Sequence, residues 1–223
     1  MWSISQLAAT GPSESPFERV FASLNTVAPP PYRAFRRLEA GIPGSTKQGW
    51  LEAWTEYQPD RGLTFEVVAE GGHEYVRNKV LRNLLTSEQE LISRGKPLRA
   101  ALESRNYEFE DAGLTADGLQ RVMLNPVRKS DGIVKGSLLF EPETGYVTRI
   151  EGRLLKSPSF WVRDVDVTWS YARLGGHVLP VEMTSAGRVR LFGRSTFKMV
   201  YDYASIDGRP APTSIKTEPR DQR

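Results

Sequence analysis

Apolar and polar residues alternate along most of the second half of the chain, from about residue 106 onward. The clearest run puts four large apolar side chains on one face: Val165, Val167, Trp169 and Tyr171. A period of two predicts strands with one covered face and one wet face. Only short turns separate these segments, so neighbouring strands must be antiparallel, because parallel pairs need long crossovers.

The first half predicts three strands of the same kind, at residues 32–40, 50–58 and 63–70. In the third, alternation assigns Leu63, Phe65, Val67 and Ala69 to one face and Thr64, Glu66 and Glu70 to the other. With the later segments this makes a sheet of about ten strands, a size at which open sheets curl or close.

Between the two groups of strands the period changes to that of an amphipathic helix, over residues 73–94. The apolar positions that repeat at three, four and seven are Val76, Val80, Leu81, Leu84, Leu85, Leu91 and Ile92. This helix is the element best able to cover the apolar face of the sheet. We therefore expect an α+β fold, with a flexible arm at residues 1–31 that can start a short helix at Pro16. The main domain would span 32–208, with a helical insertion at 73–104, and a polar tail would follow at 209–223.

Composition and charge exclude several classes of protein. Hydrophobic residues make up 39% and charged residues 26%, as in ordinary globular proteins. The net charge is only +3, and the nearest approach to a basic cluster is Arg33, Arg36 and Arg37, which we interpret as a solvated strand edge. This pattern does not predict nucleic-acid binding. The sequence has no cysteine, no apolar stretch long enough to be an integral membrane segment, and no visible signal peptide.

The catalytic motifs are missing. There is no nucleophile elbow, phosphate-binding loop or dinucleotide fingerprint. His73 and His177 flank glycine turns and fit surface positions better than a metal pair. Asp164 and Asp166 fit a wet sheet face better than a catalytic dyad. We predict that the protein is not an enzyme and that it uses no cofactor and no metal.

Aromatic and apolar residues are the positive signal, and they allow two interpretations. They can fill a solid core, or they can line a cavity under a helical lid. The candidate ligand-lining residues are Phe65, Val67, Leu84, Tyr107, Phe109, Trp169, Tyr171, Phe197, Met199 and Tyr201. Phe160 and Trp161 are adjacent aromatics between two predicted strands, and they are candidates for contact with a partner.

Residues 132–208 resemble the lipoprotein carriers of the LolA/LolB type, which sort lipoproteins to the outer membrane. The resemblance rests on an order of short motifs: Gly136-Ser137-Leu138-Leu139-Phe140, Glu143-Thr144-Gly145-Tyr146, His177-Val178-Leu179-Pro180-Val181 and Phe197-Lys198-Met199-Val200-Tyr201-Asp202-Tyr203. It implies an open antiparallel β half-barrel wrapped around a helical lid.

The resemblance also implies a function. The apolar cavity would hold a hydrophobic ligand such as an acyl chain or a lipoprotein, in the bacterial periplasm, with an envelope protein as a further partner. Such carriers often place a functional arginine within the barrel, and the quoted motifs assign none. The alternative is a structural or protein-interaction module with a solid core and no small-molecule ligand.

Overall fold

The structure, a computed structural model, describes residues 29–94, 102, 106–129, 132–156, 162–189 and 193–212. The strands are β1 (Tyr32–Gly41), β2 (Gln48–Gln58), β3 (Gly62–Gly72), β4 (Tyr107–Leu114), β5 (Gln120–Pro126), β6 (Val134–Phe140), β7 (Val147–Leu154), β8 (Val162–Leu174), β9 (His177–Val189), β10 (Gly193–Ile206) and β11 (Arg209–Pro210). A π-helical segment, η1 (Val76–Arg82), runs directly into α2 (Asn83–Ser93).

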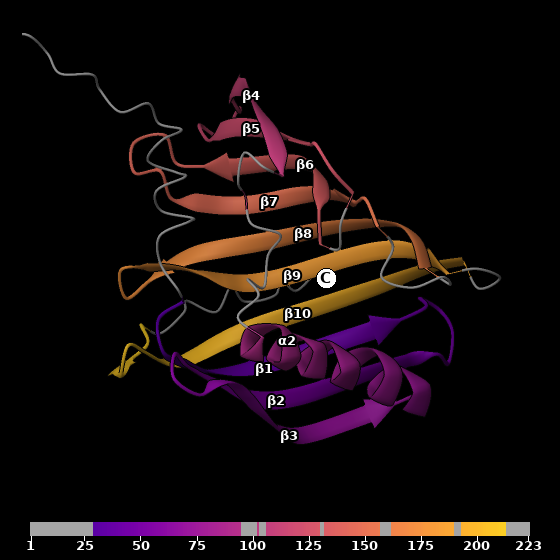
Figure 1. Ribbon diagram of the computed structural model, residues 1–223. Helices are drawn as coiled ribbons and strands as arrows, with labels where there is room; N and C mark the ends of the chain where they lie inside the picture. Colours follow the sequence, from indigo (N-terminus) through magenta and orange to yellow (C-terminus); the bar gives the residue numbers. More distant parts are fainter. Residues whose placement is uncertain are drawn as a thin grey trace, which may run out of the picture.

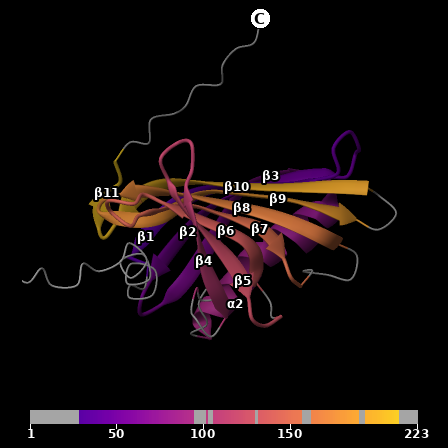
Figure 2. The same cartoon turned by 90° about the horizontal axis from the view of Figure 1, so that it is seen from above.

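All strands belong to one 11-stranded sheet, in the order β3-β2-β1-β10-β9-β8-β7-β6-β5-β4, with the short β11 on β10. Every pairing is antiparallel. β3 and β4 are the edges, so the sheet stays open, and it twists and curves with α2 against its concave face (Figures 1 and 2). The predicted fold of an open antiparallel sheet wrapping one helix is confirmed.

β6 and β7 approach one another closely where two glycines meet. Gly136 and Gly152 are paired across the two strands. A Cβ atom on Gly136 would lie 2.0 Å from the carbonyl oxygen of Glu151, so only glycine permits this spacing.

The helical segment covers the β1–β3 end of the concave face. Its apolar side packs into a cluster made of Leu38, Leu51, Ala53, Val76, Leu81, Leu85 and Met199. Leu81 and Leu85 are fully buried there, whereas Val80 and Leu91 are partly exposed. Tertiary burial of one helical face therefore holds the segment in place, as the 3.6-residue period predicted.

A second apolar cluster lies on the concave face at the other end of the sheet. Its buried members are Leu102, Tyr107, Val122, Leu124, Ile133, Leu138, Phe140, Val147, Ile150 and Tyr171. The Tyr107 hydroxyl accepts a hydrogen bond from the Val134 amide at 3.1 Å, which joins the edge strand β4 to β6. The predicted helical insertion extends to residue 104, and of its last ten residues only Leu102 belongs to the described part of the chain.

Two expectations about single residues were wrong. A β-bulge at Val68 shifts the register between β2 and β3, so that Ala69 pairs with Glu52, and Glu70 pairs with the inward-facing Leu51. Glu70 therefore points toward the helix rather than away from it, because an extra residue reverses the faces beyond the bulge.

The second correction concerns β1, which was interpreted as a solvated edge because of its three arginines. β1 lies in the interior of the sheet, between β2 and β10. Arg33 and Arg37 are exposed on the outer face, but Arg36 lies on the concave face between Ala34 and Leu38 and is completely buried.

The packing of α2 can be tested with a matched pair of substitutions. Leu85→Ala should lower the free energy of unfolding by about 2–4 kcal/mol, because it leaves a cavity in a buried cluster. Leu91→Ala removes the same atoms from a side chain that is 38% exposed and should cost well under half as much. Urea unfolding of both variants measures the difference, and equal losses would mean that α2 does not pack as described.

Candidate functional site

A buried ion pair joins β1 of the sheet to α2, on the part of the concave face that the helix covers. Arg36 Nη1 donates to Glu88 Oε2 at 2.6 Å, and Nη2 donates to Glu88 Oε1 at 3.1 Å and to the Tyr32 hydroxyl at 2.8 Å. The Arg36 side chain is 0% exposed and that of Glu88 is 14% exposed. Such a bidentate pair fixes the position of α2 over β1 and the distance between these two elements.

Tyrosines surround this ion pair. The Arg36 guanidinium lies over the Tyr201 ring, 4.5 Å from its centroid. Tyr201 stacks on Tyr203, and Tyr32 packs edge-on against Tyr203 and stacks on Tyr57. The group thus spans β2, β1 and β10, and gives the buried cation an aromatic surface in place of water.

The electrostatics keep the guanidinium charged and the phenols neutral. Burial by itself would lower the pKa of Arg36, but Tyr201, Glu88 and Tyr32 outweigh it and hold that pKa well above its usual value. Burial raises the pKa of Tyr32, Tyr201 and Tyr203. These groups are therefore suited to binding and positioning rather than to proton transfer near neutral pH.

A second set of ion pairs ties η1 to the edge strand β3. Arg77 Nη1 lies 2.7 Å from Glu70 Oε1, and Arg82 Nη2 lies 2.8 Å from Glu70 Oε2. The hydrogen bond from Arg82 lowers the pKa of Glu70, against a smaller opposing effect of burial. The helix is thus attached at two places, one buried and one partly open to water.

The predicted lining residues fall into two groups on the concave face. Around the helix the structure gathers Phe65, Val67, Leu84, Phe197, Met199 and Tyr201. On the β4–β8 side it gathers Tyr107, Phe109, Trp169 and Tyr171. Trp169 and Met183 both contact the small cluster of Val134, Val165 and Val167, and Met183 also contacts the cluster beneath the helix, so apolar contacts connect the two groups. Phe160 and Trp161 lie outside the described residues.

Sequence reasoning missed Arg36, Glu88 and Glu70, three charged residues that attach the helical segment to the sheet. A signal for Arg36 was present, because it shares the two-residue period with Ala34 and Leu38. Glu88 lies one turn after the buried Leu85 and had no comparable signal, and Glu70 depends on the bulge at Val68.

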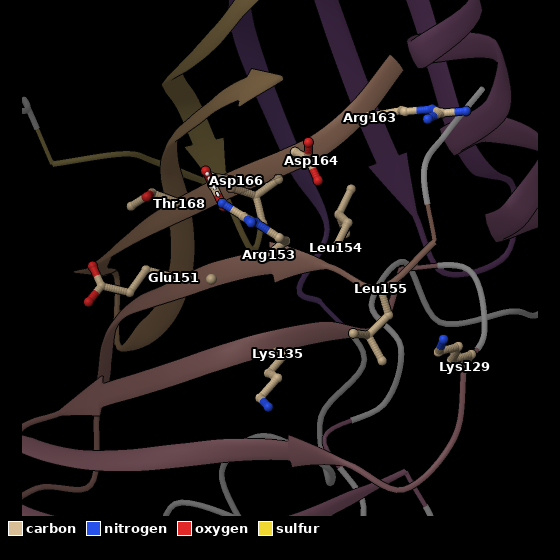
Figure 3. Close-up of a pocket in the computed structure, with 12 residues that line it drawn as sticks. Lys129, Lys135, Glu151, Arg153, Leu154, Leu155, Arg163, Asp164, Asp166 and Thr168 are labelled. Carbon is tan, nitrogen blue, oxygen red and sulfur yellow. Dashed lines mark hydrogen bonds and ion pairs between the residues drawn. The ribbon is translucent and has the colours of Figure 1, made fainter. Parts of the chain in front are cut away.

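Two open hollows lie away from the helix, on the outer face of the sheet and at its rim. One, of about 950 Å³, is lined by side chains such as Lys129, Lys135, Arg153, Arg163 and Asp166 (Figure 3). The other, of about 850 Å³, lies beside the half-exposed Trp50 and includes Arg194 and Lys198. In the first, Arg153 and Asp166 point toward one another and form an ion pair at 2.8 Å.

Within the described residues, no three or more His, Cys, Asp or Glu side chains are grouped so that they could hold a metal ion. His73 is exposed in the segment before η1, and His177 is half-buried at the start of β9. None of the helices in the described part of the chain is long and apolar enough to cross a membrane.

Removing one partner of the central ion pair should be costly. Glu88→Leu leaves the Arg36 charge buried without its carboxylate and should lower the free energy of unfolding by about 3 kcal/mol. The double variant Arg36→Met/Glu88→Leu should recover most of this loss, because apolar residues of similar size can replace a buried pair. Glu90→Leu, on the exposed side of α2, is the control and should change stability by about 0.5 kcal/mol or less. A double variant no more stable than Glu88→Leu would contradict the pairing.

The Glu70 ion pairs should make the free energy of unfolding depend on pH in the acidic range. Because the pKa of Glu70 is lowered in the folded protein, its contribution is present above the ordinary value of 4.5 and is lost as the pH falls below 4.5 through the folded-state pKa. Glu70→Gln should therefore flatten the fall in unfolding free energy between about pH 5 and pH 3. Glu66→Gln, an exposed neighbour on β3, should leave the profile unchanged, and equal profiles for wild type and Glu70→Gln would contradict the assignment.

The similarity to known proteins is a similarity of structure. No protein-family model matches the chain, and no curated protein matches it. Among solved structures, the crystal structure of a LolA superfamily protein from Nitrosomonas europaea is similar over 84% of this chain and 90% of that chain, with 7% identity and a TM-score of 0.45.

Proposed function

We propose that the protein is a non-enzymatic carrier that binds an acyl chain, as a lipid or as the lipid part of a lipoprotein, in the bacterial periplasm. One observation carries the proposal. An apolar concave face is covered at its β1–β3 end by a single helical segment, and that segment is held at its centre by the Arg36–Glu88 ion pair.

An apolar concave face suits this task, because each methylene moved out of water contributes about 0.8 kcal/mol without specific polar contacts. The described residues that the lid leaves half-buried include Phe109 and Trp169 on the far side, and Phe65 and Phe197 near the helix. We take these side chains as the surface that an acyl chain would contact once the helix moves.

The ion pair gives the lid a defined closed position. Glu88 keeps 14% exposure, so water has access to one end of the pair when the helix begins to separate from β1. Arg36 then fills the role of the arginine that the resemblance implied, since it lies on the concave face and binds the lid. The Glu70 ion pairs at the start of the helical segment would remain as its hinge.

A second candidate function, an interaction module with a solid core, is favoured by a different observation. Trp50 is 40% exposed on the outer face, where Arg33 also lies 4.2 Å from the ring centroid of Trp54. Exposed aromatic side chains of this kind often mark contacts between proteins. This function requires no displaceable ligand under the helix.

Ligand binding and release can be measured with a fluorescent acyl-chain analogue. We expect the protein to bind the analogue, to release it on addition of unlabelled fatty acid, and to retain lipid detectable by mass spectrometry after purification. Glu88→Gln should bind the analogue at least about tenfold more tightly, because the ligand then no longer has to break a hydrogen bond to a charged group that contributes about 1.5–3 kcal/mol. Glu90→Gln is the control and should bind the analogue with the wild-type affinity. A protein that neither retains lipid nor binds the analogue would leave the interaction module as the better account.

A further inference from the structure

Three arginines form a row across three neighbouring strands of the outer face. Arg163 on β8 is paired with Arg188 on β9, and Arg188 is paired in turn with Arg194 on β10. Residues paired across antiparallel strands point to the same face, with Cβ atoms about 5 Å apart. The three side chains are exposed, and none of them forms an ion pair with another residue in the described ranges.

This arrangement is unfavourable by itself. Like charges directly opposite one another destabilise a sheet, and this arginine row contains two such pairs in succession. Elsewhere on the outer face the sequence avoids the problem by pairing opposite charges, as in Arg37 with Glu52, Arg153 with Asp166, and Lys198 with Glu182. Lys135 and Arg153 are also paired across β6 and β7, but Arg153 has Asp166 as an ion-pair partner. The three arginines of the row have no such partner among the described residues, and an external anion would relieve their repulsion.

The row lies at the rim of the sheet. β8 begins at Val162, β9 ends at Val189 and β10 begins at Gly193, so each arginine is next to a strand end. Arg163 also lines the hollow that contains Lys129 and Lys135, and Arg194 lines the hollow that contains Lys198. The carboxylates that line these two hollows are Glu39, Glu151, Asp164 and Asp166. Asp166 binds Arg153 and lies near Arg194.

Carboxylates outnumber cations at the opposite rim of the sheet. Its turns carry the exposed carboxylates Asp60, Asp117, Glu141, Glu143 and Asp207, and its exposed cations include Arg61, which pairs with Asp60, and Arg209 on β11. The sheet is therefore polarised along its strands, with the arginine row at one end and acidic turns at the other. A negatively charged plane would attract the first end and repel the second, so that the molecule would meet it in one orientation.

We propose that the arginine row docks the protein onto a membrane surface rich in anionic phospholipid headgroups. Guanidinium groups bind phosphate oxygens in pairs, and a line of them matches a surface of phosphates better than it matches one small ion. The proposal concerns the outer face and does not depend on the carrier function. It adds a place at which a carrier of acyl chains would meet its source or its destination.

Vesicle sedimentation tests the docking surface with the full-length protein. Wild type should sediment with mixed phosphatidylcholine–phosphatidylglycerol vesicles, should do so less at high salt, and should stay in solution with phosphatidylcholine alone. Arg163→Gln/Arg188→Gln/Arg194→Gln should weaken binding to the anionic vesicles by at least about tenfold, since one arginine near an anionic surface is worth about fivefold in affinity. Its thermal unfolding should occur at or above the wild-type temperature, because the substitution removes repulsion.

Two further experiments distinguish the arginine row from the opposite rim of the sheet, and lipid headgroups from free phosphate. Arg61→Gln/Arg149→Gln/Arg209→Gln removes the same charge from the acidic end of the sheet and should bind the vesicles like wild type. Replacing chloride by inorganic phosphate at equal ionic strength should leave vesicle binding unchanged. The proposal is overturned if the wild-type protein does not bind anionic vesicles. That result is expected if the arginine row binds an acidic protein instead. Equal weakening in the two triple variants, or displacement by free phosphate, would overturn it as well.

Discussion

A charged hydrogen-bonded pair buried under a helix is the constraint on which the rest of this structure depends. Arg36 has no exposure and projects from an interior strand, so the chain must supply it with a carboxylate and with polarisable neighbours. Glu88 supplies the charge and the tyrosines of β1 and β10 supply the surface. The position of α2, the placement of the aromatics and the curvature of the sheet around them are all consistent with that requirement.

The same ion pair determines the register in which the helix packs on the sheet. Leucines and valines would hold an amphipathic helix on an apolar sheet in many registers, because apolar contacts are not directional. Two hydrogen bonds from one guanidinium select a single register, and the Glu70 ion pairs select it again at the start of the helical segment. A helix held in this way has one defined closed position, and the proposed carrier function requires it to leave that position as the buried charges are hydrated.

Most of the sheet and the helix could be predicted from periodicity, because alternation is set by burial of one face and the helix by its 3.6-residue repeat. The residues predicted to line a cavity lie in two connected apolar groups, and their contact with a ligand stays a prediction. The polar centre could not be predicted in full. Glu70 lies on the concave face because of a β-bulge, and no residue type in the sequence indicates that bulge. Glu88 contacts Arg36 only because α2 packs over β1, which the sequence pattern does not specify. Arg36 was misread because three arginines in one strand suggested a wet edge, although its spacing from Ala34 and Leu38 placed it on the covered face.

The central claim is that the helical segment is a lid which a hydrophobic ligand displaces from the ion pair. Because the chain contains no cysteine, spin labels can be placed only where cysteines are introduced, at Leu91→Cys on α2 and Thr196→Cys on the outer face of β10. The most direct measurement is the distribution of distances between these two labels with and without a saturating acyl ligand. The account predicts a single distance without ligand and a second, longer distance when the ligand is bound. One unchanged distance in the presence of bound ligand would contradict it.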